Sequence, residues 1–574
     1  MILNNAQLSY VYSKLLVETL LHAGISGVCV SPGFRNSPLI LAAHKAMGEK
    51  VFTHIDERGA AFFALGLARA TGKPAAVICT SGTAAANYFP AVLEAYYANI
   101  PLIIITADRP HELIGIGANQ SMRQDNLFGS HVHLQVSIPA PTAGVEGLRH
   151  LQLSSKRLFS TATGPRPGPV HLNISFREPF LASQAEIAEI PASAMEPLET
   201  DFYQLKASAL VIPTSILSKV RAAKRPCLLV GPGELDELQK KNIGSFATIS
   251  RTPVFAEASS GLGCGSASEK ILLRFDHYFR SKKVQMNLSP DLVIRIGAAP
   301  TSKVMLSLLE RTPQLIIDYP GEAKNPSLGP ASFLSTTRDE ASIVLSELAK
   351  SLSPDQDWCS ALYELERETE LALNEHLAGD VFTEWQWLRE AHRYLSPGAN
   401  IFIGNSMQIR DLDAVFPKQS EEHTVYSNRG LSGIDGILST AIGVATAKKI
   451  PTHLFVGDIT ALHDLNALCL AKRLSENISL TIWLQNNSGG EIFRMVKTSE
   501  SGVPEEWFTT PQVIDFAALA KGFGISFMRV TKLSDLEGLG PEDFSSTGVR
   551  IVELIFSGPE NMQCRKKFWE SFRE

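Results

Sequence analysis

The chain has 574 residues, which is too long for one ordinary core and predicts about three or four domains. Hydrophobic residues make up 44% of it and charged residues 20%, the profile of a globular rather than a disordered or fibrous protein. The formal net charge of −6 provides no basic excess, which argues against a nucleic-acid-binding protein.

The N-terminal stretch and the cysteines indicate an ordinary intracellular chain. Residues 1–24 mix polar and apolar side chains in a helical pattern, without the basic segment and apolar block of a signal peptide. No run approaches the 18 apolar residues of a membrane span. The seven cysteines are scattered and form no C-x-x-C, which argues against a disulfide framework or a zinc site. We therefore expect a cytoplasmic protein.

The first third of the chain alternates strand and helix signals. Short apolar runs such as "GVCV", "AAVICT" and "PLIIITAD" are separated by glycine-marked turns and by helical patterns such as "ERGAAFFALGLARATG". This alternation predicts a doubly wound parallel sheet over residues 1–185. The Pro- and Glu-bearing segment 185–205 has the composition of a linker.

Two further α/β units follow. The runs "RPCLLVG", "TPVFAE", "DLVIRIG" and "QLIIDY" predict a central domain over residues 200–355. After a break at 351–358 and a helical segment around 360–396, five more strand-like runs predict a third domain over residues 375–574. The fold class is therefore α/β, with three doubly wound parallel-sheet domains.

Asp458 is the first candidate site residue, because it directly follows the apolar run "HLFV" and Gly457. Asn487 follows the next such run, 29 positions later, which accommodates one helix and a return strand. A right-handed crossover would bring both residues to the same edge of the sheet. Their oxygens, with a backbone carbonyl, would suit Mg²⁺. The alternative is a helix cap and a turn, and the two residues alone do not decide between them.

Glu57 is the second candidate. It follows Asp56 in "HIDERGAAFF", where a strand gives way to a helix. Both acids could simply stabilise the helix N-terminus, and the sequence alone favours that interpretation. The functional alternative is a partly buried carboxyl group that holds a proton on a ligand nitrogen.

Arginines in turns form a third group. They lie in or after loops that follow strand-like runs, and several guanidinium groups in one cleft would suit a substrate with more than one carboxylate. Taken singly, each could be a solvated loop residue. The members are Arg35, Arg109, Arg123, Arg410 and Arg429. The stretch "VGPG" at 230–233 lacks the third glycine of a dinucleotide-binding loop and is interpreted as a turn.

Nine motifs in order carry a resemblance to a known family. They are "SPGFRNSPL", "DERGAAFFALGLA", "TSGTAAAN", "TADRPHEL", "GANQSMRQ", "GNSMQIRDLD", "YSNRGLSGIDG", "GDITALHDLNAL" and "NNSGGEIF". The chain resembles thiamine-diphosphate-dependent enzymes of the decarboxylase and acetolactate-synthase type. Within them it is similar to the 2-succinyl-5-enolpyruvyl-6-hydroxy-3-cyclohexene-1-carboxylate synthase family of menaquinone biosynthesis. The match covers residues 8–500 and is weaker in the central domain.

The resemblance implies a transferase that decarboxylates 2-oxoglutarate and adds the resulting carbanion to isochorismate. It implies thiamine diphosphate and Mg²⁺ or Mn²⁺ as cofactors, with a pyrimidine-binding, a central and a diphosphate-binding domain. In this family the catalytic glutamate reaches a cofactor held by the other subunit, so the resemblance also implies a homodimer or homotetramer. No nucleic acid or membrane partner is expected.

The resemblance also assigns roles to individual residues. Glu57 would be catalytic and would hydrogen-bond the cofactor's pyrimidine ring. The expected metal ligands are Asp458, Asn487 and the carbonyl of Gly489. The other expected cofactor contacts are Ser81, Gly82, Thr83, Ile492 and Phe493. The expected substrate contacts are Arg35, Gln120, Lys303, Ser406, Arg410 and Arg429.

Some residues depart from the family's pattern. Phe34 stands where members commonly have serine, which removes one hydroxyl contact. Val304 stands where some members carry a second basic residue, which affects the expected carboxylate contact at Lys303. Ser488 replaces the more usual Asn or Asp. The alternatives to this family are another thiamine-diphosphate 2-oxoacid decarboxylase or carboligase, and a non-catalytic relative that keeps the fold.

Overall fold

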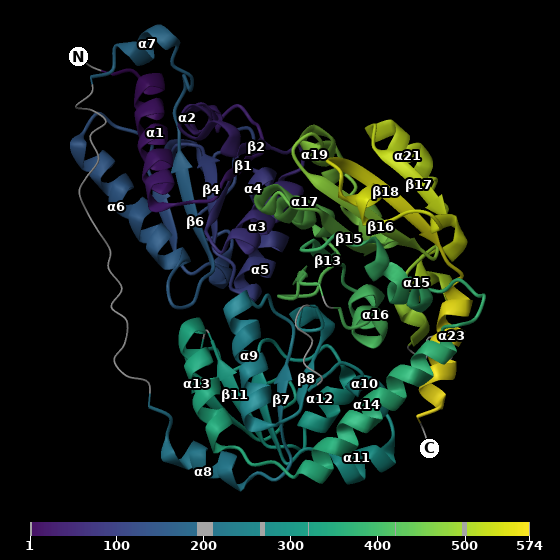
Figure 1. Ribbon diagram of the computed structural model, residues 1–574. Coiled ribbons are helices and arrows are strands. Elements are labelled where there is room, and N and C mark those ends of the chain that lie inside the picture. Colours follow the sequence, from purple (N-terminus) through teal and green to yellow (C-terminus); the bar gives the residue numbers. More distant parts are fainter. Residues whose placement is uncertain are drawn as a thin grey trace. The chain divides into compact units, whose positions relative to one another are not determined.

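A computed structural model describes residues 3–191, 211–264, 270–319, 321–419, 421–495 and 502–572. Three six-stranded sheets organise the chain, and every strand pairing in them is parallel. Helices alternate with the strands along the chain (Figure 1). The predicted α/β fold class, with three parallel sheets, is confirmed.

The first sheet lies within residues 28–175 and has the order β2-β1-β3-β4-β6-β5. Its strands are β1 (Val28–Val30), β2 (Val51–Thr53), β3 (Ala75–Cys79), β4 (Leu102–Asp108), β5 (Gln135–Ile138) and β6 (Pro169–Ser175). Its helices are α1 (Asn5–Ala23), α2 (Ser37–Met47), α3 (Glu57–Thr71), α4 (Thr83–Asn87), α5 (Phe89–Ala98), α6 (Val145–Ala162) and α7 (Gln184–Ala188). The strands β5 and β6 were not predicted from the sequence.

The central sheet has the order β12-β11-β10-β7-β8-β9. Its strands are β7 (Pro226–Val230), β8 (Val254–Ala256), β9 (Ile271–Leu272), β10 (Leu292–Ile296), β11 (Gln314–Asp318) and β12 (Ala331–Ser335). The accompanying helices are α8 (Thr214–Ala222), α9 (Glu237–Ser250), α10 (Phe275–Tyr278), α11 (Lys282–Leu288), α12 (Lys303–Leu309) and α13 (Arg338–Ser351). The strands β9 and β12 were not predicted.

Strand β7 shows how this sheet is buried on both faces. Successive side chains point to opposite faces, so Leu228 and Val230 join the core beneath α9 and α13, whereas Cys227 and Leu229 join the core beneath α12 and α14 (Gln356–His376). Helices α9 and α13 lie side by side on their face of the sheet (Figure 1). A strand that is covered on both faces has a continuous apolar sequence, which is why "RPCLLVG" is easy to recognise.

The third sheet has the order β14-β13-β15-β16-β18-β17. Its strands are β13 (Asn400–Ile403), β14 (Thr424–Tyr426), β15 (Thr452–Gly457), β16 (Ser479–Asn486), β17 (Ser526–Val530) and β18 (Gly548–Ile555). The helices in this stretch of the chain, after α14, are α15 (Glu384–Glu390), α16 (Met407–Val415), α17 (Ile437–Lys448), α18 (Asp458–His463), α19 (Ala467–Leu474), α20 (Glu506–Thr509), α21 (Phe516–Phe523), α22 (Pro541–Ser545) and α23 (Gly558–Glu570). The strand β17 was not predicted.

The contacts within the chain divide it into two compact units. The N-terminal unit comprises residues 1–206, 428–449 and 463–477, and the C-terminal unit comprises residues 207–427, 450–462 and 478–574. The strands of each sheet lie within one of the predicted ranges 1–185, 200–355 and 375–574, and the boundaries of these ranges stay predictions. Of the predicted linker 185–205, residues 185–188 belong to α7, and those from 192 onward lie outside the described residues.

Helix α17 belongs to the N-terminal unit because it packs closely on α3. A Cβ atom at Gly66 would lie 2.2 Å from the carbonyl oxygen of Thr440, and one at Gly443 would lie 2.3 Å from that of Phe63. Each helix therefore needs glycine where it meets the other.

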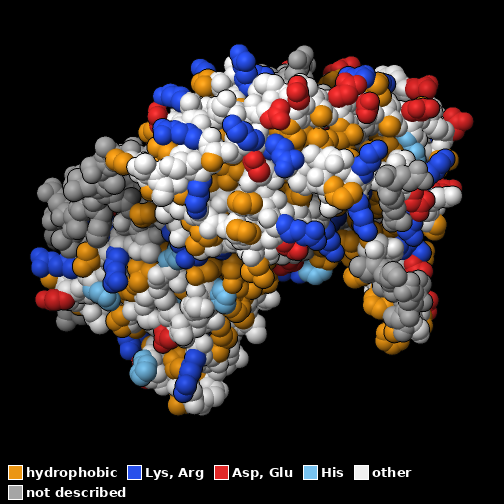
Figure 2. All heavy atoms as spheres, turned by 90° about the horizontal axis from the view of Figure 1, so that it is seen from below, with side chains coloured by type: hydrophobic (Ala, Val, Ile, Leu, Met, Phe, Trp, Pro, Cys, Tyr) orange, Lys and Arg blue, Asp and Glu red, His pale blue; other side chains and the backbone are white. Residues whose placement is uncertain are grey.

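On the face shown in Figure 2, acidic and basic side chains are interspersed with hydrophobic and uncharged groups, and no broad area of its described part is covered by Lys and Arg alone. Among the residues that the structure describes, none of the helices combines the length and the apolar character needed to span a bilayer.

Candidate active site

Asp458 and Asn487 lie at the carboxyl edge of the third sheet, each one residue beyond the end of a strand. β15 ends at Gly457 and β16 at Asn486, and the two strands are parallel neighbours with Gly457 paired to Gln485. The sequence predicts this adjacency, and the strand pairing confirms it. The carboxyl edge is where open α/β sheets usually bind ligands.

Each of these two residues leaves one buried oxygen unpaired. Asp458 is 3% exposed; its Oδ1 accepts a hydrogen bond of 2.7 Å from the N–H of Ile459, whereas its Oδ2 has no partner in the described part of the chain. Asn487 donates its Nδ2 to Glu384 at 2.7 Å, and its buried Oδ1 likewise has no partner there. An unpaired buried polar atom costs about 1–3 kcal/mol, so two of them on adjacent strands indicate that a ligand is meant to fill the space.

Burial raises the pKa of Asp458 to about 7, and the nearby negative charge of Glu384 adds to this effect. Backbone N–H groups, first that of Ile459 and then that of Gly489, lower the pKa but do not offset the burial. A divalent cation beside the carboxylate would supply the missing positive charge and displace the proton.

Gly489 provides the third expected oxygen. Its φ is +154°, and a Cβ atom there would lie 2.6 Å from the carbonyl oxygen of Thr509, so only glycine fits. Its carbonyl accepts one hydrogen bond of 3.0 Å, from the N–H of Glu491, and keeps a second lone pair. One carboxylate, one amide oxygen and one carbonyl form a hard-oxygen set that fits Mg²⁺ if water and phosphate oxygens complete the shell.

No cluster of three or more His, Cys, Asp or Glu side chains suited to a metal occurs among the described residues. The Asp458–Asn487 edge, with its single carboxylate, matches an ion that shares its shell with a phosphorylated ligand.

Ile492 and Phe493 lie just beyond, in the 3-10 turn Glu491–Met495. Ile492 is half-buried, and Phe493 is 40% exposed with its ring centroid 6.2 Å from that of Phe508. The turn therefore adds apolar side chains beside the polar edge.

Glu57 is the first residue of α3, and it is not the residue that caps this helix. Asp56 is the N-cap, and its side chain accepts hydrogen bonds from the N–H groups of Arg58 at 3.0 Å and Gly59 at 3.4 Å. Asn466 also donates to Asp56, at 3.2 Å. Because Asp56 caps the helix, the half-buried Glu57 is not needed for that purpose.

The turn after β3 is held by two glutamines. Gln120 donates its Nε2 to the carbonyl of Ser81 at 2.9 Å, and Gln124 accepts the N–H of Gly82 at 2.9 Å. Gly82 has a φ of +83°, and its Cα faces the side chain of Gln120. Thr83 is exposed at the start of α4. The structure thus brings Ser81, Gly82 and Gln120 together.

Arg35 lies in the same region of the N-terminal unit. Its guanidinium group donates to the carbonyl of Phe176 at 2.5 Å and stacks on the ring of Phe180 at 4.7 Å. Arg109 donates to the hydroxyl of Ser81. Burial lowers the pKa of Arg35, and the positive charge of Arg109 lowers it further. Two neighbouring guanidinium groups that disfavour each other's charge suit an anionic ligand.

Arg429 lies in a loop that a buried carboxylate holds. Glu94, which is 3% exposed on α5, accepts the N–H groups of Gly430 and Leu431, both at 2.8 Å, and pairs with Arg69 at 3.4 Å. A Cβ atom at Gly430 would lie 2.6 Å from the carbonyl oxygen of Glu94, so the loop requires glycine there. The loop and α3 and α5 also line a cavity of about 240 Å³.

The remaining predicted substrate contacts lie in the C-terminal unit. Ser406, with a φ of +72°, precedes α16, and Arg410 donates to its carbonyl. Lys303 is the exposed first residue of α12, whose start is fixed by hydrogen bonds from two backbone N–H groups to Glu257. No hydrogen bond or ion pair in the described part of the chain joins Lys303 to another predicted site residue.

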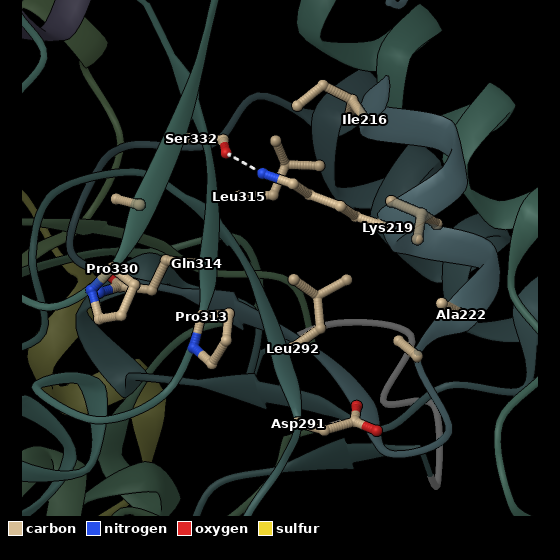
Figure 3. Close-up of a pocket in the computed structure, with 13 residues that line it drawn as sticks. Ile216, Lys219, Ala222, Asp291, Leu292, Pro313, Gln314, Leu315, Pro330 and Ser332 are labelled. Carbon is tan, nitrogen blue, oxygen red and sulfur yellow. Dashed lines mark hydrogen bonds between the residues drawn. The ribbon is translucent and has the colours of Figure 1, made fainter. Parts of the chain in front are cut away.

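A larger cavity, of about 520 Å³, lies against the central sheet (Figure 3). It is lined by α8 and by residues at the amino ends of β10, β11 and β12, the edge opposite to the one that binds ligands in such folds. Its polar groups are already paired. Lys219 donates to Ser332 at 3.1 Å, and Asp291 accepts the N–H groups of Lys224 and Arg225. It is therefore a poor candidate for the active site.

Sequence reasoning missed two acids that hold candidate site loops, Glu94 in the N-terminal unit and Glu384 in the C-terminal unit. Each lies inside an amphipathic helix or at its start, more than 100 residues from the loop that it holds. No local motif marks such a residue. The only signal in the sequence would have been an acidic residue at an expected buried position of a helix, with no basic residue nearby to pair with it.

Two family models match the chain. One, described as the thiamine pyrophosphate enzyme, N-terminal TPP binding domain, matches residues 11–129. The other, described as the thiamine pyrophosphate enzyme, C-terminal TPP binding domain, matches residues 411–554. Thiamine pyrophosphate is another name for thiamine diphosphate. The second model includes Asp458 and Asn487, and the first includes Glu57.

Curated relatives align with nearly the whole chain. Three examples, all named 2-succinyl-5-enolpyruvyl-6-hydroxy-3-cyclohexene-1-carboxylate synthase, illustrate the similarity. The protein from Geobacillus kaustophilus is 34% identical, over 97% of each chain. The one from Haloarcula marismortui is 32% identical, over 98% of each chain. The one from Microcystis aeruginosa is 33% identical, over 97% of this chain and 98% of its own.

Proposed function

Because this chain belongs to the 2-succinyl-5-enolpyruvyl-6-hydroxy-3-cyclohexene-1-carboxylate synthase family, it is a thiamine-diphosphate-dependent carboligase, and we propose that it joins 2-oxoglutarate to isochorismate with loss of CO₂. The observation that carries the proposal is similarity over the full length to relatives of that one name. The product would be the compound in the family's name, in menaquinone biosynthesis.

We assign the cofactor's metal, Mg²⁺ or Mn²⁺, to Asp458, Asn487 and the carbonyl of Gly489. The two unpaired buried oxygens of Asp458 and Asn487 support this assignment. When bound, thiamine diphosphate supplies a nucleophilic carbon and the electron sink that decarboxylation requires. Ile492 and Phe493 would shield the reacting carbon from water. Ser81, Gly82 and Thr83 would contact the cofactor from the first sheet's edge.

Glu57 would act on a proton of the cofactor. Its carboxyl group would hydrogen-bond a nitrogen of the pyrimidine ring and exchange a proton with it. The arrangement at α3 supports this role, because Asp56 caps the helix and Glu57 remains available.

The substrates would each be held through two carboxylates. The six proposed contacts are Arg35, Gln120, Lys303, Ser406, Arg410 and Arg429. Arginine binds carboxylates with two parallel hydrogen bonds, which fixes position as well as charge. The neighbouring guanidinium groups of Arg35 and Arg109 support an anion site in the N-terminal unit.

A direct test uses the purified protein with thiamine diphosphate, Mg²⁺ and 2-oxoglutarate. We expect CO₂ to be released much faster when isochorismate is added, with the joined product detected by mass spectrometry. Equal release with and without isochorismate would exclude the proposed acceptor and favour a different thiamine-diphosphate decarboxylase or carboligase. No release in either case would favour a non-catalytic relative.

We further propose a homodimer or a homotetramer, in which Glu57 serves a cofactor held by the other subunit. The neighbouring Ile55 is 66% exposed, an apolar side chain beside the site that a second copy could cover. The test mixes two inactive variants, Glu57→Gln and Asp458→Asn, after dissociation and reassociation. Shared sites predict recovery of up to about one quarter of wild-type activity, because half of the dimers are mixed and each has one intact site. No recovery, with mixed dimers verified by mass, would place both residues in the same subunit's site.

A further inference from the structure

We propose that Glu384 is a positioning residue for the metal: it fixes the amide of Asn487 so that the carbonyl oxygen of that amide faces the ion. This inference rests on the metal site proposed above. It concerns residues that no motif singles out, and it extends the site to the C-terminal helix α23.

The hydrogen bond between Asn487 and Glu384 decides which way the amide points. An asparagine side chain carries a donor end and an acceptor end that can exchange places by rotation. The carboxylate of Glu384 only accepts, and it receives Nδ2 of Asn487 at 2.7 Å. The donor end is therefore committed to Glu384, and the acceptor end, Oδ1, is left buried and unpaired. That is the orientation a cation needs.

Glu384 is itself rigidly held. It is 0% exposed, and its second oxygen forms an ion pair with Arg565 of α23, which is 1% exposed. Arg565 also binds both oxygens of Asp411, at 2.6 and 3.0 Å. The N–H of Glu384 donates to Asn561 at 2.9 Å, one helical turn before Arg565. Helix α23 thus holds the start of α15 through two side chains on one face.

The charges of this group also favour a cation. One guanidinium group serves two buried carboxylates, those of Glu384 and Asp411, so the cluster carries one uncompensated negative charge. A divalent cation at the carbonyl oxygen of Asn487 would offset that charge. Partners that orient a metal ligand typically change metal affinity 10- to 100-fold when they are removed.

The first experiment measures binding of Mn²⁺ by the full-length protein in the presence of thiamine diphosphate, from the loss of the free-ion signal in electron paramagnetic resonance. We expect Glu384→Ala to weaken binding about 10- to 100-fold. The matched control is Glu370→Ala, which removes another carboxylate that lies between two arginines, Arg274 and Arg389, and touches no proposed ligand. It should bind Mn²⁺ as the wild type does. Equal weakening in both variants would overturn the inference.

Asp458→Ala separates this inference from the proposed function. If that variant binds Mn²⁺ as tightly as the wild type, the metal site itself is wrong. If it loses Mn²⁺ while Glu384→Ala retains full affinity, the metal site stands and only the role of Glu384 fails.

A reversal of the hydrogen bond keeps the test decisive even if Glu384→Ala folds poorly. In Asn487→Asp two carboxylates would face each other, so Mn²⁺ binding should weaken at least about tenfold. Adding Glu384→Gln would restore a donor, now from residue 384 to residue 487. We therefore expect Glu384→Gln to weaken binding in the wild-type background and to strengthen it in the Asn487→Asp background. The same sign in both backgrounds would show that Glu384 acts only on folding.

Discussion

The first and third sheets have the same strand order when the strands are counted within each domain: 2-1-3-4-6-5. Their two central strands, β3 and β4 in one and β15 and β16 in the other, therefore end at equivalent places. In both sheets these ends carry polar residues. Ser81 and Asp108 follow or end the first pair, and Asp458 and Asn487 follow the second.

The two edges differ in how their polar groups are paired. In the first sheet, Ser81 accepts from Arg109, and Asp108 accepts from Asn173 at 2.8 Å and from the N–H of Arg109 at 2.7 Å. In the third sheet, Asp458 and Asn487 each keep a buried oxygen without a partner in the described chain. Topology decides where polar groups gather at a sheet edge. Pairing within the chain distinguishes the third sheet's edge, where two unpaired oxygens remain for the proposed metal, from the first sheet's edge, where Ser81 and Asp108 are already held by neighbouring side chains.

The largest expected effect is that of changing Glu57. This residue has a proposed chemical role beside the first sheet, whereas the residues at the edge of the third sheet have a proposed binding role. Glu57→Gln removes a proton donor and acceptor without removing a proposed metal ligand. We expect kcat to fall about 10²- to 10⁴-fold while the affinity for thiamine diphosphate stays within about threefold. Single-turnover CO₂ release and calorimetric titration of the cofactor measure the two quantities. Turnover close to that of the wild type would remove Glu57 from the proton exchange.

The next largest effect is a loss of stability where α3 packs on α17. Gly66→Ala would place a Cβ atom 2.2 Å from a backbone carbonyl oxygen, which cannot move without shifting the helix. We expect a loss of about 1–3 kcal/mol, seen as a lower thermal midpoint.

The matched control for that substitution is Gly244→Ala in α9, where a Cβ atom meets nothing within 4 Å. It should raise stability slightly, by about 0.5–1 kcal/mol. Equal changes for both variants would show that the close approach of α3 and α17 does not matter.

The loop that contains Arg429 lies in the N-terminal unit, and Glu94 accepts hydrogen bonds from two of its backbone N–H groups. Glu94→Gln keeps the size of the side chain but leaves only one acceptor for the two N–H groups of Gly430 and Leu431. We expect KM for one substrate to rise about tenfold, with cofactor affinity unchanged. Glu112→Gln, which breaks only the exposed ion pair with Arg177, should change KM less than about twofold. A similar KM for both variants would contradict the role of Glu94.

The smallest effect is expected at Asp464, a buried acid that can be compared directly with Asp458. Burial raises its pKa to about 7, like that of Asp458, but both of its oxygens accept from Ser439. The folded protein therefore holds a proton that the unfolded chain releases, so this contribution to stability is present at low pH and declines as pH rises from about 4 to 7. Relative to Asp464→Asn, the wild type should lose about 1 kcal/mol between pH 6 and pH 7.

Melting curves of the two proteins at pH 5, 6, 7 and 8 measure that difference, and Mn²⁺ titration provides the contrast with Asp458. Asp464→Asn should leave the Mn²⁺ affinity unchanged. A pH-independent difference in melting, or a loss of Mn²⁺ binding, would contradict this account.

Most of the predicted strands are buried, whereas several of the missed strands carry polar side chains in their interior or lie at a sheet edge. β6 carries His171 and Asn173 in its interior; Nε2 of His171 hydrogen-bonds Thr106, and Asn173 accepts from Thr106 and Gln124, which lie in distant segments. β12 and β17 lie at sheet edges and are only partly covered, so their apolar pattern is weak. Hydropathy along the chain cannot anticipate a partner that arrives through the fold.

The candidate site shows the same limit. Asp458, Asn487 and Glu57 follow strand ends, so their positions can be predicted from the run of apolar residues before them. Glu384 and Glu94 act through loops more than 100 residues away, and their function depends on tertiary contacts alone. Local sequence therefore indicates the residues at a sheet edge but not the residues that orient them.

The way the chain divides between the two compact units has a consequence for biosynthesis. It crosses from one unit to the other at residues 206–207, 427–428, 449–450, 462–463 and 477–478. The N-terminal unit is incomplete until residue 477 has left the ribosome, long after the last strand of its sheet, which ends at Ser175, has emerged. Until residues 437–448 emerge, the glycine-containing face of α3 has no α17 to cover it. We therefore expect a fragment of residues 1–185 to aggregate when made alone, although its sheet is complete, and the nascent chain to depend on chaperones over that interval.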